Sequence, residues 1–107
     1  MPPSEQDIQR KILRYLNGLP ECVAYKIAAG PYSMGGLPDV LCCYRGRMVA
    51  VEVKKPGGRT TAQQEARLSE IRSAGGWAIV AFSVDDVAAI IAAVDLDIDH
   101  GSVAILD

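Results

Sequence analysis

The chain has 107 residues, of which 50% are hydrophobic and 22% are charged, so it is suited to one packed domain over residues 1–107. This composition excludes general disorder. The net charge of −2 argues against a polybasic, histone-like protein. The charge is unevenly distributed, because residues 1–44 are neutral, residues 45–72 carry +4 and residues 73–107 carry −6.

Nothing in the sequence indicates secretion or membrane insertion. The N-terminus, Met-Pro-Pro-Ser-Glu-Gln-Asp, lacks the apolar core of a signal peptide. The longest apolar run, residues 87–94, is far shorter than the ~20 residues that cross a bilayer. The three cysteines, Cys22, Cys42 and Cys43, lack the spacing of a disulfide framework or a zinc site. We therefore expect a soluble cytoplasmic protein in a reducing compartment, without a membrane partner.

The first predicted element is an amphipathic helix over residues 5–17. Its inward stripe recurs at helical spacing and consists of Ile8, Ile12, Leu16 and Leu19. Ser4 is the expected N-cap, with Asp7 at the capping-box position where Glu or Gln is usual. We expect Gly18 to end the helix in the left-handed conformation that glycine adopts at many C-caps.

Three strands follow, and their predicted ranges are 23–28, 40–44 and 48–54. The last two are expected to form a hairpin, because Gly46 lies between them and can supply the positive φ of a tight turn. If Arg45 and Gly46 form a two-residue turn, Tyr44 pairs with Arg47 and the register of the hairpin is fixed.

The remaining elements are a second helix, a fourth strand and a third helix. The helix begins at Thr60 or Thr61 and ends near Gly75, the strand covers residues 77–82, and the last helix covers 84–94 after a Ser83 cap. The tail, residues 95–107, is ambiguous, and residues 102–106 could form a late strand. The order α-β-β-β-α-β-α predicts an α/β fold with a mixed central sheet flanked by helices.

The strongest chemical signal is Pro38-Asp39, followed after twelve residues by Glu52-Val53-Lys54. A two-residue turn would place Asp39 opposite Glu52, with Cβ atoms ~4.5–5.5 Å apart, whereas a three-residue turn would offset them. Two carboxylates this close repel each other unless a proton or a cation lies between them, and oxygen ligands suit Mg²⁺ or Mn²⁺. Lys54 shares their face and could orient a water or stabilise phosphate charge.

A simpler interpretation of this pattern is a capping Asp and a Glu/Lys pair on a solvated hairpin face. The strand over residues 48–54 is otherwise apolar on both faces, which favours a central strand with a functional charged pair. Glu5 and Gln64 lie on the inward stripes of their helices, where each alone could be a cap or edge residue. Together with the hairpin, they indicate a site of converging polar groups.

Four segments in this order resemble the VRR-NUC family of the PD-(D/E)xK nuclease superfamily: Ser4-Glu5…Gln9, Gly36-Leu37-Pro38-Asp39, Glu52-Val53-Lys54 and Thr61-Ala62-Gln63-Gln64. Leu68 and Gly75-Gly76 follow, and the resemblance covers about residues 4–87. It implies a restriction-endonuclease-like core that hydrolyses DNA phosphodiester bonds with Mg²⁺ or Mn²⁺ and leaves 3′-hydroxyl and 5′-phosphate ends.

The resemblance also implies a role for each site residue. Asp39, Glu52 and the Val53 carbonyl would be metal ligands, Lys54 would be the catalytic lysine, and Glu5 and Gln64 would be supporting residues. Stand-alone members of this size resemble Holliday-junction resolvases, which work as homodimers on branched DNA. The sequence thus predicts an endonuclease selective for four-way junctions, flaps or similar DNA.

Other residues are candidates for contacts with DNA. Arg45, Arg47, Lys55 and Arg59 either form a solvated face or hold phosphates, and Tyr32 either packs in its loop or stacks on DNA. The glycine-rich segments 30–36 and 57–58 are interpreted as mobile loops that frame a cleft.

The apolar helix over residues 87–94 is expected to be buried on more than one side, and residues 88–107 could form a homodimer contact. Two other functions remain open. One is a catalytically silent DNA-binding or assembly subunit on the same scaffold, and the other is an unrelated α/β interaction domain that binds no divalent metal.

Overall fold

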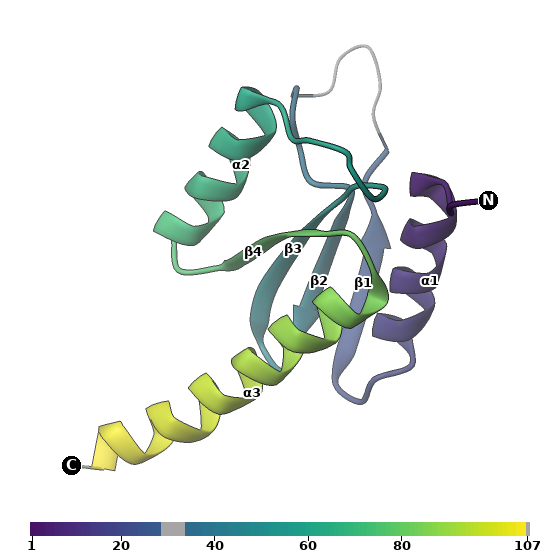
Figure 1. Ribbon diagram of the computed structural model, residues 1–107. Helices are drawn as coiled ribbons and strands as arrows, with labels where there is room; N and C mark the ends of the chain where they lie inside the picture. Colours follow the sequence, from purple (N-terminus) through teal and green to yellow (C-terminus); the bar gives the residue numbers. More distant parts are fainter. Residues whose placement is uncertain (29–33, 107) are drawn as a thin grey trace.

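The computed structural model describes residues 1–28 and 34–106, and the side chains up to residue 100. Within these ranges a four-stranded sheet is flanked by three helices, which confirms the predicted α/β fold (Figure 1). The elements are, in chain order, α1 Glu5–Asn17, β1 Cys22–Lys26, β2 Val40–Tyr44, β3 Arg47–Val53, α2 Ala62–Ser73, β4 Trp77–Ala81 and α3 Val84–Leu106.

The sheet is mixed, and its strand order is β1-β2-β3-β4. Antiparallel pairing joins β1 to β2 and β2 to β3, whereas β4 lies parallel to β3 after the crossover through α2. Tyr44 pairs with Arg47, as the two-residue turn predicts. Arg45 and Gly46 have φ values of 49° and 80°, which are the left-handed conformations of a type I′ hairpin turn.

Side chains alternate between two differently covered faces of the sheet. One face packs against α1 and α3 in a core that includes Ile12, Leu16, Val40, Val49, Val51, Val53, Val87 and Val94. The other face packs against α2 through a smaller cluster around Ala50, Leu68 and Ala78. Because α2 packs on β3 and β4, the second face is covered over only part of its width.

Two predicted boundaries differ from the structure at the N-terminal end of the fold. The Ser4–Asp7 capping box is present and α1 ends at Asn17, but the left-handed conformation predicted for Gly18 is wrong, since its φ is −87°. The Gly18 amide still reaches carbonyls of the last turn in this conformation, and the chain turns at Glu21, with φ 56°. The first strand stops at Lys26, two residues before its predicted end.

The larger correction concerns the C-terminal segment. The third helix continues from Val84 to Leu106, so the late strand predicted over residues 102–106 is wrong. The apolar spacing that starts the helix persists, because Val87, Ile91 and Val94 are all buried in the same core. The C-terminal turns of α3 project beyond the sheet (Figure 1). Among the described residues, none of the helices is apolar over a length that could span a bilayer.

Candidate functional site

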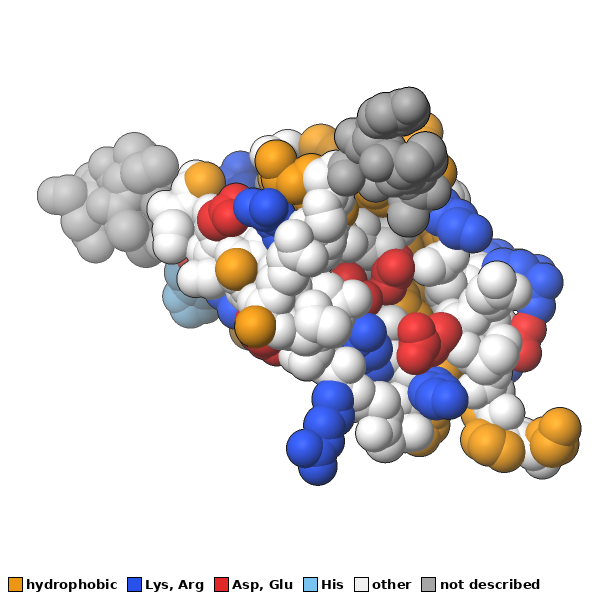
Figure 2. Space-filling model, turned by 90° about the horizontal axis from the view of Figure 1, so that it is seen from above, with side chains coloured by type: hydrophobic (Ala, Val, Ile, Leu, Met, Phe, Trp, Pro, Cys, Tyr) orange, Lys and Arg blue, Asp and Glu red, His pale blue; other side chains and the backbone are white. Residues whose placement is uncertain are grey.

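Four segments distant in sequence meet at one end of the sheet. Because β2 and β3 are antiparallel, the residue before β2 lies beside the end of β3. The first turns of α1 and α2 lie at this same end (Figure 1). Figure 2 looks down on it and shows acidic side chains in the middle of the face, with Lys and Arg side chains around them. The fold thus gathers the segments that contain Glu5, Asp39, Glu52 and Gln64.

Asp39 and Glu52 form the centre of this region. The observed register, continued by one residue beyond the Val40–Val51 pair, places Asp39 opposite Glu52 as predicted. One Asp39 carboxylate oxygen, Oδ2, accepts a hydrogen bond of 2.8 Å from the Val53 amide, which fixes this side chain against β3. Glu52 is only 2% exposed, although its side chain is ionisable and the four strand residues before it are apolar.

The environment of Glu52 disfavours its ionised form. Burial raises the pKa of Glu52, the neighbouring Asp39 carboxyl raises it further, and Glu5 adds a smaller effect in the same direction. The Lys54 ammonium partly opposes this rise in pKa. Glu52 Oε1 is buried and has no hydrogen-bond partner among the described residues. A buried carboxylate oxygen in this state lacks a donor or a cation to stabilise it.

Lys54 is the positive group of the site. Its Nζ lies 3.7 Å from Glu52 Oε2, and its side chain is 11% exposed, so the ammonium is held at the border between the interior and solvent. Glu52 and Lys54 therefore share one face of the chain, as their spacing predicts. The lysine lies close enough to Glu52 to compensate part of its charge, but it leaves Oε1 without a partner.

Gln64 connects the cap of α2 to the site. Thr61 Oγ1 accepts a hydrogen bond of 3.1 Å from the Gln64 amide, and Gln64 Oε1 accepts one of 2.9 Å from the Thr61 amide. This capping box orients the side-chain amide, so that Gln64 Nε2 donates to Glu52 Oε2 at 3.4 Å. The sequence indicated Gln64 as a site residue and Thr60 or Thr61 as the start of the helix, and the structure identifies Thr61 as the cap that orients the Gln64 side chain.

Glu5 occupies the first position of α1 and is half-buried. Its charge contributes to the raised pKa of Glu52, which places it in the electrostatic surroundings of the site. No three His, Cys, Asp or Glu side chains within residues 1–28 and 34–100 come close enough to hold a metal ion together. Glu5 is therefore a neighbour of the Asp39–Glu52 pair in this arrangement rather than a third ligand.

Gly35 and Gly36 lie in the segment that leads to Asp39. From the sequence they were interpreted only as part of a mobile loop. Gly36 has a φ of 77°, and a Cβ there would lie 2.9 Å from the Gln63 carbonyl oxygen, so a larger residue would be strained. Arg67 Nε donates to the Gly35 carbonyl at 3.1 Å. These contacts hold Gly35 and Gly36 against α2, and together with Asp39 and Gln64 they line a hollow of about 230 Å³.

The donor set fits a hard divalent cation. Asp39 and Glu52 supply carboxylate oxygens, and one of those oxygens, Glu52 Oε1, is buried without a partner among the described residues. A cation between the two acids would offset both their repulsion and the cost of burying Glu52. Mg²⁺ and Mn²⁺ prefer such oxygen ligands.

The predicted DNA-binding residues are divided between the two ends of the molecule. Lys55 and Arg59 are exposed in the loop directly after β3, at the end that carries Glu52. Arg45 and Arg47 lie at the hairpin turn, and Arg47 lies five positions before Glu52 along the strand, which corresponds to ~17 Å. Tyr32 lies outside the described residues.

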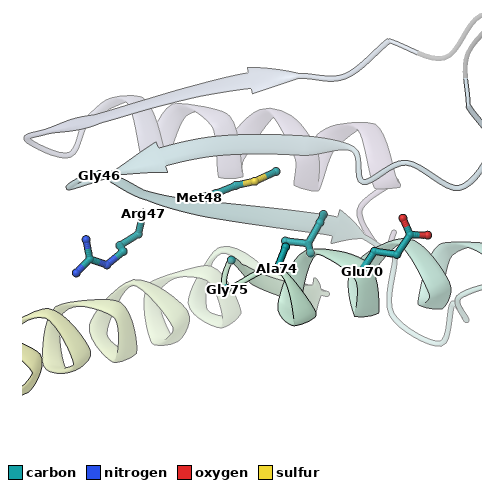
Figure 3. Close-up of a pocket in the computed structure, with 8 residues that line it drawn as sticks. Gly46, Arg47, Met48, Glu70, Ala74 and Gly75 are labelled. Atoms are coloured by element: carbon teal, nitrogen blue, oxygen red, sulfur yellow. The ribbon is translucent and has the colours of Figure 1, made fainter.

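Arg45 has a structural partner at the turn. Its guanidinium donates to Asp95 on α3 at 2.8 Å, and Tyr44 donates its hydroxyl to the same carboxylate oxygen, also at 2.8 Å. A hollow of about 360 Å³ lies beside this turn, between the start of β3 and the end of α2 (Figure 3). Its lining contains one base and one acid, Arg47 and Glu70, and is otherwise apolar side chain or glycine. It therefore lacks the paired carboxylates found at the other end.

Comparisons with known proteins support the fold. No family model matches the sequence, and no curated protein matches it. Among solved structures, a "VRR_NUC domain" is 23% identical with a TM-score of 0.67, covering 83% of this chain and 96% of that one. A "VRR_NUC domain protein" is 20% identical with a TM-score of 0.69, covering 85% and 87%. The chain therefore has the fold of the VRR-NUC domain, as its sequence motifs predict.

Proposed function

We propose that this protein is a divalent-metal-dependent endonuclease that hydrolyses phosphodiester bonds of DNA. The observation that carries the proposal is the buried Glu52, whose Oε1 has no partner among the described residues and whose neighbour is a second carboxylate, Asp39. Burying two neighbouring carboxyl groups without full compensation costs free energy of folding. Such a cost is typical of a functional site rather than of a stabilising ion pair. The VRR-NUC fold adds support by analogy.

Each residue has a proposed role in the reaction. Asp39, Glu52 and the Val53 main-chain carbonyl would hold Mg²⁺ or Mn²⁺. When bound, the cation would supply Lewis-acid polarisation of the phosphoryl group and neutralise its charge. Lys54 would orient the attacking water and stabilise the charge that develops on the phosphate. Gln64 and Glu5 would keep Glu52 in place and set the charge around it.

The proposed substrate is branched DNA, such as a four-way junction or a flap, and the proposed assembly is a homodimer. Lys55 and Arg59 lie at the site end and would hold phosphates. For the dimer contact we propose the outer side of α3 with the adjoining β4. Phe82 and Leu96 are 41% and 60% exposed there, and apolar side chains line a hollow between the two elements. Light scattering tests this assembly, and a monomer would contradict it.

A cleavage panel tests the proposed activity. Duplex, flap, fork and four-way junction DNA would be incubated with Mg²⁺, Mn²⁺ or a chelator. We expect cleavage with the metals only, and a loss of at least ~100-fold for two variants. Glu52→Gln removes a proposed metal ligand, and Lys54→Ala removes the cation proposed to stabilise the phosphate. Glu21→Gln removes an exposed carboxylate at the opposite end of the sheet and is the matched control, with unchanged activity expected.

Two outcomes of this panel would reject the proposal in different ways. Normal cleavage by Glu52→Gln would remove Glu52 from the mechanism. Tight binding of branched DNA without metal-dependent products would instead favour the catalytically silent subunit. Calorimetric titration with Mn²⁺ provides a second readout, since an unrelated interaction domain is expected to bind no metal at this pair.

A further inference from the structure

The sheet face that carries the site is covered over only part of its width. Side chains alternate along the strands, so those that share the face of Ala50 and Leu41 form a continuous row next to α2. The members of this open sheet face are Val23, Tyr25, Leu41, Cys43 and Met48. Val23, Tyr25 and Met48 are 42%, 65% and 45% exposed. None of the described helices packs over them.

This open sheet face is continuous with the candidate site. Tyr25 pairs with Leu41, and Leu41 is two residues from Asp39 on the same side of the chain. Tyr25 is therefore a diagonal neighbour of Asp39, at the Cα separation of ~7–8 Å that such neighbours have. The face is hollowed by about 330 Å³, and Gly46 and Met48 line both this hollow and the one in Figure 3. An apolar floor thus extends from the site toward the turn.

The position of the nearest cations favours a nucleic acid on this floor. No charged side chain of the three strands except Glu52 shares the open sheet face, because Lys26 and Arg47 alternate with its members and point to the opposite face. The exposed cations Lys55 and Arg59 follow β3 at the site end, where they can hold phosphates. An exposed aromatic ring on a rigid strand next to such a site is suited to stacking on a nucleic-acid base.

We propose that the open sheet face binds unpaired bases of the DNA strand that is cut, with Tyr25 stacking on a base beside the scissile phosphate. This inference rests on the proposed nuclease function and makes its substrate class more specific. A base in an intact duplex is already stacked on both sides, so a ring can take it only where the strand is unpaired. The face therefore favours flaps, forks or single strands over fully paired DNA.

Equilibrium binding in a chelator tests this inference without cleavage. Fluorescent flap DNA, single-stranded DNA and a blunt duplex would be titrated with the full-length wild-type protein and its variants. We expect Tyr25→Ala to weaken binding of the flap and the single strand about 10-fold, because one stacked base is lost, and to leave duplex binding nearly unchanged. Tyr25→Phe retains the ring and should bind like the wild type.

Tyr25→Phe is the matched control, because it removes only the hydroxyl group and keeps the exposed ring on the open sheet face. A photocrosslink between Tyr25 and 5-iodouracil placed in the flap, located by mass spectrometry, would support the contact directly. Both Tyr25 variants should keep the circular dichroism spectrum of the wild type, since the side chain lies at the surface.

Several results would overturn the inference. Equal losses on flap and duplex would mean a general phosphate contact, and an unchanged flap affinity of Tyr25→Ala would exclude stacking. A change from dimer to monomer in Tyr25→Ala, with unchanged DNA affinity, would identify the face as a contact with a second copy. A different result would reject the proposed nuclease function but not the stacking of bases on Tyr25. In that case the wild-type protein would prefer unpaired DNA but give no metal-dependent product.

Discussion

At the residue scale, the main question is why the chain keeps two carboxylates together in an apolar environment. Glu52 is buried, its Oε1 lacks a partner among the described residues, and the Asp39 carboxyl raises its pKa. Lys54 compensates only part of this charge. A pair held in this way destabilises the protein without a cation, so its stability should respond to metal in a way that a structural ion pair would not.

The variant Asp39→Asn tests this expectation. Asparagine retains an oxygen that can accept the Val53 amide hydrogen bond, but it removes the charge beside Glu52 and leaves the Lys54 pair intact. In a chelator at neutral pH we expect the variant to be more stable than the wild type by about 1–2 kcal/mol, the free energy of a pKa shift of roughly one unit. Chemical denaturation measures this difference.

The effect of metal on the melting temperature should distinguish the wild type from Asp39→Asn. Magnesium or manganese should raise the melting temperature of the wild type, because the ion binds only the folded state, and should have little effect on Asp39→Asn. If the variant is less stable than the wild type in the chelator, the two carboxylates do not repel each other as inferred. If both proteins respond equally to metal, the ion binds elsewhere.

Much of this residue-level arrangement could be predicted from the sequence. The Asp39–Glu52 register follows from a two-residue turn, and the side-chain alternation of a strand places Lys54 beside Glu52. The ion pair of Arg45 with Asp95 could not be predicted, because no local pattern connects the hairpin to a residue 50 positions away. The packing of Gly36 on Gln63 likewise required the tertiary structure.

At the element scale, α2 shows how a helix cap and a functional group can be the same residue. Gln64 completes the capping box with one side-chain atom and reaches Glu52 with the other. The cap therefore fixes which atom of the amide faces the site. A glutamate is also a good capping-box residue at this position, but it has no N–H to donate to Glu52.

Gln64→Glu therefore separates the two roles. We expect the stability of this variant with magnesium to stay within about 1 kcal/mol of the wild type, since the capping box is retained. We expect cleavage to fall at least ~10-fold, because a carboxylate replaces the amide donor beside Glu52. Thr61→Ala is the converse variant and should lose about 1 kcal/mol of stability with its cap. Retained activity in Gln64→Glu would limit Gln64 to capping.

The hydrogen bonds from the hairpin to Asp95 on α3 lead to a prediction about pH. Hydrogen bonds from Arg45 and Tyr44 lower the pKa of Asp95 in the folded protein. The stabilisation is therefore present above the unfolded-state pKa of about 4, and it is lost as the pH falls through the lower folded-state value. We expect the wild type to be more stable than Asp95→Asn at neutral pH and the difference to shrink in acid.

Urea denaturation of both proteins between neutral and acidic pH measures this change. The control is Asp97→Asn, which removes an exposed carboxylate two residues further along the same helix. Its stability relative to the wild type should not change with pH. If the stability difference between the wild type and Asp95→Asn were the same at all pH values, the charge of the Asp95 carboxylate would not contribute to these hydrogen bonds.

The hydrogen bonds between the hairpin and Asp95 also explain why α3 was predicted only in part. The apolar run of residues 87–94 was a strong helical signal, whereas the following residues alternate acidic and apolar types, which is also a strand pattern. Tertiary contacts decide between the two, because Asp95 bonds to the hairpin and Ile91 and Val94 continue the buried stripe. Local sequence alone does not contain that information.

At the scale of the whole molecule, the uneven charge of the chain acquires a spatial meaning. The segment of net +4, residues 45–72, contains the end of β3 and the start of α2, which form the candidate site. The segment of net −6, residues 73–107, forms β4 and α3. Because β4 is parallel to β3 and ends beside Val53, Asp85 and Asp86 begin α3 near the site end, whereas Asp95 and Asp99 lie beside Arg45 at the hairpin turn. The low net charge is therefore compatible with a locally basic approach to the site.

This distribution predicts which bases contribute to DNA binding. Arg59 lies in the exposed loop after β3, at the site end. Arg14 is also exposed but lies nine residues along α1 from Glu5, or ~13 Å. Removing a phosphate contact lowers the dependence of the binding constant on salt, by about 0.9 in the logarithmic slope for duplex DNA. We expect this decrease for Arg59→Ala and no change for Arg14→Ala.

The measurement is a titration of flap DNA at several salt concentrations in a chelator, so that cleavage does not contribute. Both variants lose the same charge, and the change in net charge of the protein is therefore identical. If the two slopes decrease equally, the protein attracts DNA through its overall field, and the local basic approach is wrong. If only Arg59→Ala changes the slope, the phosphate backbone passes the end of β3, where Glu52 and Lys54 can reach it.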